Sequence, residues 1–170
     1  MTETLTLYKL IVLYMLHKVD FPLTTAQISD FILEQGYTTY FKLQEALSQM
    51  IDSDLVQVEN THNRTLYHIT ENGTETIRFF RNKISPEIQQ EINDFLKDRA
   101  YDLKEEVSVK ANYYRNTAHE YEVHCQILEN QSRLLELKLT VPTEKEAEAI
   151  SANWNTRCQE IYADLLGKLL

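Results

Sequence analysis

The side chains that could bind a metal ion or act as a nucleophile are scattered along this sequence. The candidates are His17, His62, His68, His119, His124, Cys125 and Cys158. Two of the histidines lie close together, but no third ligand follows them at the spacing that zinc sites use. The sequence also lacks a glycine-rich phosphate loop and a GxSxG motif. We therefore predict no enzymatic activity, no metal and no cofactor.

A second set of side chains is suited to contacting nucleic acid. It consists of Thr38, Thr39, Tyr40, Phe41, Lys42, His62, Asn63 and Arg64. Lys42 can reach a phosphate or a guanine, the hydroxyl groups can reach either, and Phe41 can meet a thymine methyl group. Arg64 is the only lysine or arginine between Lys42 and Arg78. Arginines at hairpin tips commonly lie along the minor groove or on a phosphate, so Arg64 is the expected contact there.

Two helices joined by a tight turn are expected to position the first part of this set. The stretch TTAQ is a capping box, with Thr24 as N-cap and Gln27 at position N3. The helix that it opens ends at Gly36, and a second helix occupies residues 38–51. The core-facing stripe of the second helix is Leu43, Ala46, Leu47 and Met50. This stripe leaves Phe41, Lys42, Glu45, Ser48 and Gln49 towards solvent. The N-terminus of such a helix favours a phosphate.

The remaining part of the set falls at the tip of a predicted hairpin. Two short alternating runs, LVQV and TLYHI, are joined by polar residues. Helix, helix, tight turn, helix and hairpin is the order of a winged helix-turn-helix domain. In that fold the helix over 38–51 enters the major groove, and the wing over 59–65 lies on the backbone or the minor groove. A further helix is expected from Thr74 to Arg81.

The second half of the chain is expected to hold a helix, three strands and a final helix. Ser85-Pro86-Glu87 starts a helix whose apolar stripe continues to about Leu103. The apolar period then changes to two from Val107 onward, which predicts three antiparallel strands with a hairpin turn over 129–132. A capping box over 142–146 opens the last helix, which covers the apolar face of the sheet. The predicted fold class is α+β. It comprises a winged helix-turn-helix domain over residues 1–83 and a dimerisation or regulatory domain over 84–170.

The helix predicted from Leu5 to Val19 is apolar on all sides. Such a helix must be covered on all sides, either by a second domain or by a second subunit. We expect a homodimer, with this helix and the helix from Pro86 to Leu103 as candidates for the seam. The competing account is that the C-terminal sheet and last helix cover it within one chain, which leaves a monomer.

The charge balance does not by itself favour a polyanion as partner. The chain carries a net charge of −9, divided as −3 over residues 1–83 and −6 over the rest. Any binding to nucleic acid must therefore come from a local arrangement of cations. The N-terminus has no basic leader, and its apolar stretch is too short for a membrane span. We expect a soluble, cytoplasmic chain that binds no membrane, with both cysteines as reduced, buried thiols.

Residues 24–73 resemble PadR-like and related bacterial winged-helix regulators. The similarity is carried by TTAQI, YFKLQEALSQMIDSDLV and YHITENG. The whole chain resembles a bacterial family of unknown function that joins such a domain to a strand-rich C-terminal part. YEVHCQILEN, LLELKLTVP and AEAISANWNTRCQEIYADLL carry that second similarity. The resemblance implies a transcriptional regulator that acts as a homodimer.

Two functions from different classes are therefore expected for this chain. The first is a dimeric transcriptional regulator whose partners are double-stranded DNA and a second copy of itself. The alternative is a winged-helix adaptor in which the same helix contacts protein and no DNA. The sequence identifies neither the operator nor any small-molecule effector, and it does not give the sign of regulation.

Overall fold

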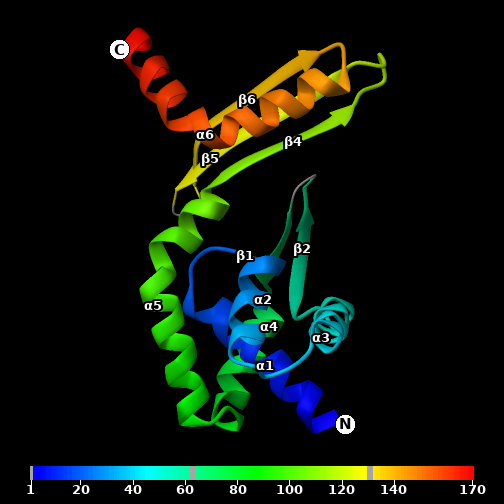
Figure 1. Cartoon of the computed structure of the whole chain (residues 1–170), viewed down its shortest axis with the longest axis vertical. Helices are drawn as coiled ribbons and strands as arrows, with labels where there is room; N and C mark the ends of the chain where they lie inside the picture. Colours follow the sequence, from blue (N-terminus) through cyan, green and yellow to red (C-terminus); the bar gives the residue numbers. More distant parts are fainter. Residues whose placement is uncertain (1, 62–63, 130–131) are drawn as a thin grey trace. The chain divides into compact units, whose positions relative to one another are not determined.

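The computed structural model describes residues 2–61, 64–129 and 132–170 (Figure 1). In this part of the chain the fold is α+β, with six α-helices and two three-stranded antiparallel sheets. The elements are α1 (Thr2–Lys18), β1 (Leu23–Thr24), α2 (Thr25–Glu34), α3 (Tyr40–Asp52), β2 (Val56–Asn60), β3 (Thr65–Ile69), α4 (Glu71–Phe80), the 3₁₀ helix η1 (Arg81–Lys83), α5 (Pro86–Ser108), β4 (Val109–Arg115), β5 (Tyr121–Glu129), β6 (Ser132–Val141) and α6 (Glu144–Leu169). They form two compact units, Met1–Lys104 and Glu105–Leu170.

Helix α1 is the centre of the core of the first unit. Tyr8 and every residue from Leu10 to Leu16 are at most 8% exposed. The helix lies against α3, α4 and β3, and the Tyr14 hydroxyl donates a hydrogen bond to Asn93 Oδ1 of α5 at 3.1 Å. The residues that bury α1 therefore belong to this same unit, whereas the sequence predicted a second domain or a second subunit in this role. The apolar residues of α1 from Leu10 to Leu16, which were expected to need a second subunit, are thus buried within the first unit.

The first eighteen residues of α5, Pro86 to Leu103, belong to the same core. Phe95 packs on Phe31 of α2 with ring centroids 5.0 Å apart, and Ile92 is fully buried. The buried Gln27 Nε2 donates to the Leu103 carbonyl at 3.2 Å. These contacts explain why the boundary between the compact units falls after Lys104, and not after residue 83, where the sequence suggested a division.

The first sheet has the order β1-β3-β2. The hairpin of β2 and β3 matches the sequence prediction, but the third strand does not appear in that prediction. Strand β1 is only two residues long, and Leu23 and Thr24 pair with Tyr67 and Leu66. Its pairing partners lie more than forty positions away, so no local pattern identifies it. This short strand fixes the hairpin to the start of α2.

The second unit has the strand order β4-β5-β6, with α6 packed on one face of the sheet. Its core contains Trp154, whose Nε1 donates to the Gln126 carbonyl at 3.2 Å, and the buried thiols of Cys125 and Cys158. The predicted capping box is present at the start of α6, where Thr143 and Glu146 bond to each other's backbone N–H groups. The hairpin turn expected over 129–132 includes residues 130 and 131, which lie outside the described part.

Helix α5 continues five residues beyond its predicted end at Leu103. Val107, which the sequence analysis assigned to a strand, is a buried residue of the helix. The error has a simple cause, because Leu103 and Val107 are four residues apart and Val107 and Val109 are two apart. Val107 therefore fits the period of a helix and that of a strand equally well.

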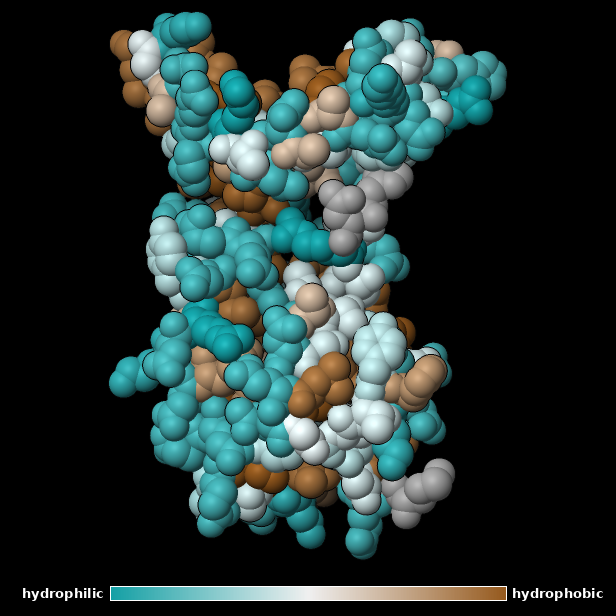
Figure 2. Space-filling model, in the orientation of Figure 1, coloured by the Kyte–Doolittle hydropathy of each residue, from teal (hydrophilic) through white to brown (hydrophobic). Residues whose placement is uncertain are grey.

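The surface in view is mostly hydrophilic, with hydrophobic side chains in small separate patches (Figure 2). Among the described residues, no helix combines the length and the apolar character needed to cross a membrane.

Candidate nucleic-acid interface

The turn between α2 and α3 determines where the N-terminus of α3 lies. Gly36 adopts a φ of +70°, which closes α2 with little steric cost. Its N–H donates to Leu33 O and the next N–H, of Tyr37, donates to Ile32 O. These two bonds are the Schellman arrangement. The chain reverses within a few residues, so α3 starts close to the end of α2, as the sequence analysis predicted.

The N-terminus of α3 is exposed and carries most of the predicted contact residues. Thr39 is the N-cap, and its hydroxyl accepts from Lys42 N at 3.4 Å. Tyr40 and Phe41 are 53% and 84% exposed and their rings meet edge to face, with centroids 6.4 Å apart. Lys42 is also exposed, and the first turn contains no acidic residue. The helix dipole and the ammonium group of Lys42 therefore act together to favour an anion here.

The opposite face of α3 anchors the helix in the core, as its apolar stripe predicted. Leu43, Ala46, Leu47 and Met50 are buried. Among the residues expected towards solvent, Glu45 is exposed and its Oε1 accepts from Gln49 Nε2 at 3.5 Å. Thr38 departs from the expected pattern, because its residue is half-buried and its hydroxyl oxygen is buried. Thr38 is thus less accessible to a partner than the four residues that follow it.

The hairpin of β2 and β3 extends away from the helices of its unit (Figure 1). Two hydrogen bonds connect the ends of its loop: Thr61 Oγ1 donates to the Arg64 carbonyl and accepts from Arg64 N, both at 3.1 Å. Arg64, the expected contact at the hairpin tip, is half-buried. His62 and Asn63, the other two predicted contact residues of the wing, lie outside the described residues.

A side-chain hydrogen bond that the sequence did not predict crosses this hairpin. His68 Nε2 of β3 lies 3.0 Å from Glu59 Oε2 of β2. In the strand register Glu59 faces Leu66, so His68 is its diagonal neighbour on the same face. The alternation of apolar and polar residues in the two strands indicates which face each side chain occupies. Which side chains meet across the strands depends on the register, which the sequence alone does not give. The carboxylate of Glu59 offsets the charge of Arg64, so residues 59–65 carry no net charge when their histidine is neutral.

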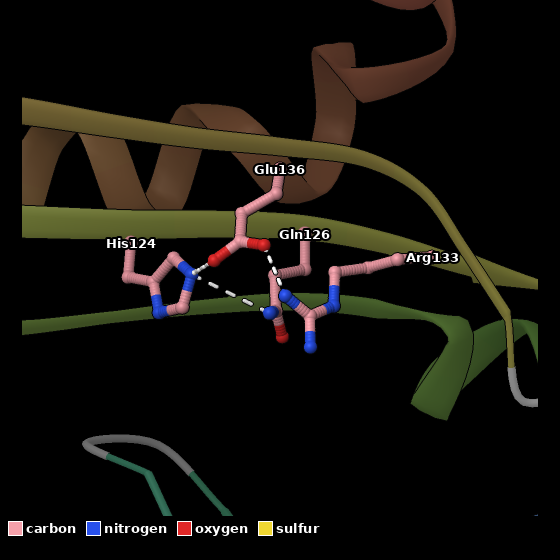
Figure 3. Close-up of polar contacts among 4 residues, drawn as sticks. All are labelled: His124, Gln126, Arg133 and Glu136. Atoms are coloured by element: carbon pink, nitrogen blue, oxygen red, sulfur yellow. Dashed lines mark hydrogen bonds and ion pairs between the residues drawn. The ribbon is translucent and has the colours of Figure 1, made fainter.

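The second unit holds a separate polar cluster on the face of the sheet away from its core (Figure 3). Glu136 of β6 forms an ion pair with Arg133 and a hydrogen bond with His124 of β5, and Gln126 Nε2 lies 3.4 Å from His124 Nε2. Hydrogen bonds from Arg133 and then from His124 lower the pKa of Glu136 below its usual value. The sequence does not indicate this cluster, because the meeting of His124 with Glu136 depends on the register of β5 and β6. Within the described residues no group of three histidine, cysteine or acidic side chains is placed to hold a metal ion.

Comparison with protein families gives one finding. The model of a domain of unknown function, DUF4364, matches residues 8–169. No curated protein and no solved structure matches the chain.

Proposed function

The chain belongs to the DUF4364 family, and we propose that it is a DNA-binding transcriptional regulator that acts as a homodimer. The observation that carries this proposal is the exposed N-terminus of α3, with Thr39, Tyr40, Phe41 and Lys42 beside a hairpin. The order from α1 to β3, including the tight turn before α3, is that of a winged helix-turn-helix. That fold assignment is part of the proposal.

In the proposed complex the first turn of α3 enters the major groove. Lys42 contacts a phosphate or a guanine, and the free backbone N–H groups of the helix contact a phosphate. Phe41 is exposed enough to meet a thymine methyl group. The hairpin over 59–65 acts as the wing, with Arg64 on the backbone or in the minor groove.

Few cations are available to contact DNA, so we expect one copy of the chain to bind weakly and a dimer to bind more tightly. Residues 1–83 carry a net charge of −3, so one copy makes few phosphate contacts. Two copies joined by a two-fold seam would present two α3 helices about one DNA turn apart, ~34 Å. The second contact is then effectively intramolecular, which raises the overall affinity without new residues.

The end of α6 is the strongest support for such a seam. Its packed face includes Trp154 and Cys158, and the same helical face continues as Tyr162, Leu165 and Leu169. Leu166 and Leu169 are 40% and 79% exposed. An apolar strip of this kind on an otherwise polar helix is typical of a surface that packs against another chain.

A second function is favoured by one specific observation. Tyr40 and Phe41 expose more apolar surface at the start of α3 than a contact with DNA phosphates needs. In an adaptor these two rings would insert into a pocket of another protein, which would bury their exposed apolar surface. In that case α3 binds protein and no DNA.

Salt dependence of binding separates the two functions. We would select bound fragments from genomic DNA and measure the binding of a labelled selected duplex by fluorescence anisotropy across a salt series. Phosphate contacts release counterions, so the affinity of a regulator falls steeply with salt. Lys42→Ala and Arg64→Ala should each weaken binding and reduce the slope by about one unit.

The matched control is Lys97→Ala, which removes an exposed lysine of α5 and should leave DNA binding unchanged. Unchanged binding by the double variant of Lys42 and Arg64 at low salt would end the DNA-binding proposal. A chain that selects no fragments at all would favour the adaptor.

A further inference from the structure

A second exposed surface of the first unit combines cations with phenyl rings. We call it the basic–aromatic surface, and it consists of Lys18, Arg78, Phe79, Phe80, Arg81 and Lys83. Every residue from Arg78 to Lys83 is exposed. Phe79 is 77% and Phe80 is 40% exposed, and their ring centroids lie 4.8 Å apart. The surface lies at the C-terminal end of α4, whereas the opposite end of α4 contacts Asp54 just after α3.

The ring of Tyr14 brings the cations of two helices together. Lys18 Nζ, at the end of α1, lies 5.3 Å from the ring centroid, and Arg81 Cζ lies 5.6 Å from it. In the described part of the chain no carboxylate forms an ion pair with Lys18, Arg78, Arg81 or Lys83. Burial, and then the charges of Arg78, Lys18 and Arg81, lower the pKa of the neighbouring His17. The local potential is therefore positive in a chain whose net charge is −9.

Helix stability explains only part of this arrangement. Cations at the C-terminal ends of α1 and α4 interact favourably with the helix dipoles. The phenyl rings have no such role, because α4 packs into the core through Gly73 and Ile77 instead. Phe79 leaves most of its surface in water, at a cost that a polar residue would avoid. Arg81 Nε donates to Gln89 Oε1 at 3.3 Å, but within the described residues none of these cations is paired with a carboxylate. Cations without a carboxylate partner, around exposed phenyl rings, are suited to a partner that is both anionic and apolar.

We propose that the basic–aromatic surface binds a short acidic segment of another protein, with its carboxylates on Arg78, Arg81 and Lys83 and an apolar side chain on the phenyl pair. Guanidinium groups match carboxylates in geometry and can bind them with two parallel hydrogen bonds.

The size of the surface favours a short segment over an extended polyanion. Exposed acids lie near these cations in the sequence, namely Asp20 two residues after Lys18, Glu75 one turn before Phe79 and Glu87 at the start of α5. A bilayer of anionic lipids or a nucleic acid would cover these acids as well and be repelled by them. The two phenyl rings also lie at 77° to each other, so they cannot both stack on consecutive bases. A segment of a few residues contacts the cations and avoids these acids.

The test uses the full chain and a fluorescein-labelled synthetic peptide that alternates glutamate with leucine. We expect saturable binding by anisotropy at low salt, and no binding of the same peptide with glutamine in place of glutamate. Arg78→Glu combined with Lys83→Glu should weaken peptide binding about tenfold or more, because two attractive charges become repulsive. Both side chains are exposed, so the chain should stay folded. Loss of the favourable interaction with the dipole of α4 should lower the melting temperature only slightly.

Further variants separate the phenyl contribution and the proposed DNA contact. Phe79→Ser should weaken peptide binding without affecting the fold. Lys97→Glu, a charge reversal elsewhere on α5, and Lys42→Glu, on α3, should leave peptide binding unchanged. Lys42→Glu should at the same time abolish binding of the selected duplex, so failure of either proposal is distinguishable from failure of the other.

Three results would overturn the inference. The first is no saturable peptide binding by the wild-type chain. The second is equal binding by the wild-type chain and the variant altered at positions 78 and 83. The third is binding to phosphatidylserine vesicles or to oligo-dT through the same residues when the peptide does not bind.

Discussion

At the scale of single residues, burial controls the reactivity of the two cysteines. Burial raises the pKa of Cys125 to about 11 and also raises that of Cys158. Because the thiolate is the reactive form, neither thiol should react with iodoacetamide at mildly alkaline pH in the folded chain. After unfolding in urea without reductant, both should alkylate, as mass spectrometry would show. A chain that gains only one adduct, or none, would contradict the presence of two free thiols.

The hydrogen bonds that Glu136 accepts from Arg133 and His124 predict a pH dependence with a definite sign. The folded chain holds the pKa of this carboxyl below its usual value, so the ionised form contributes stability at neutral pH. That contribution is lost as the pH falls through the lowered pKa. Glu136→Gln should therefore lower the melting temperature at neutral pH, and the difference from wild type should vanish in acid. Glu129→Gln is a control at an exposed position of β5. A difference that persists at low pH would show that the contacts of the ionised carboxylate are not its cause.

At the scale of elements, alanine substitution of Gly73 tests how tightly α4 packs, with Gly36 and Gly167 as comparisons. A Cβ at Gly73 would lie 2.2 Å from the Leu55 carbonyl oxygen and 2.9 Å from Ile69 Cγ1. The backbone oxygen cannot move aside cheaply, so Gly73→Ala should destabilise the first unit by about 3 kcal/mol. Gly36→Ala meets no neighbour but sits at positive φ, and should cost about 1 kcal/mol. Gly167→Ala, with open space in α6, should stabilise by up to about 1 kcal/mol.

Urea titration of the three alanine variants gives these values from the shift in midpoint. The predicted order of stability is Gly167→Ala, wild type, Gly36→Ala and Gly73→Ala. If the change at Gly73 were as mild as the change at Gly36, α4 would not lie as close to Leu55 as described.

Local signals predicted elements well, and pairings between distant positions were not predicted. The capping boxes at Thr24 and Thr143 are recognisable from a few consecutive residues, and both are present in the structure. The two-residue strand β1 and the packing of α5 beside α2 depend on contacts across many positions. The same distinction applies to the candidate site. The cap at Thr39 is a local feature, whereas the Glu136 cluster and the meeting of Lys18 with Arg81 follow only from the tertiary fold.

At the scale of the whole molecule, the exposed end of α6 predicts a dimer. Light scattering should give a mass near twice the chain mass of 20.0 kDa. Leu166→Asp combined with Leu169→Asp should return it to the monomer value, because each aspartate puts a charge into the proposed apolar seam. Leu134→Asp is the control, since Leu134 is an exposed leucine on β6, with 42% exposure against 40% for Leu166. A wild-type mass near 20.0 kDa would rule out the dimer.

The edge position of β6 also affects how copies of the chain behave when they are crowded together. An edge strand offers unpaired backbone groups on which a strand of another copy can add, and repeated addition leads to fibrils. Strand β6 is ten residues long and exposes Leu134 and Leu139, which makes it a hazard of this kind. Arg133 and Lys138, both exposed on the same strand, oppose that addition, because each would meet a like charge or lose its hydration. These two cations therefore act against aggregation, and their removal would shorten the time that concentrated solutions stay clear.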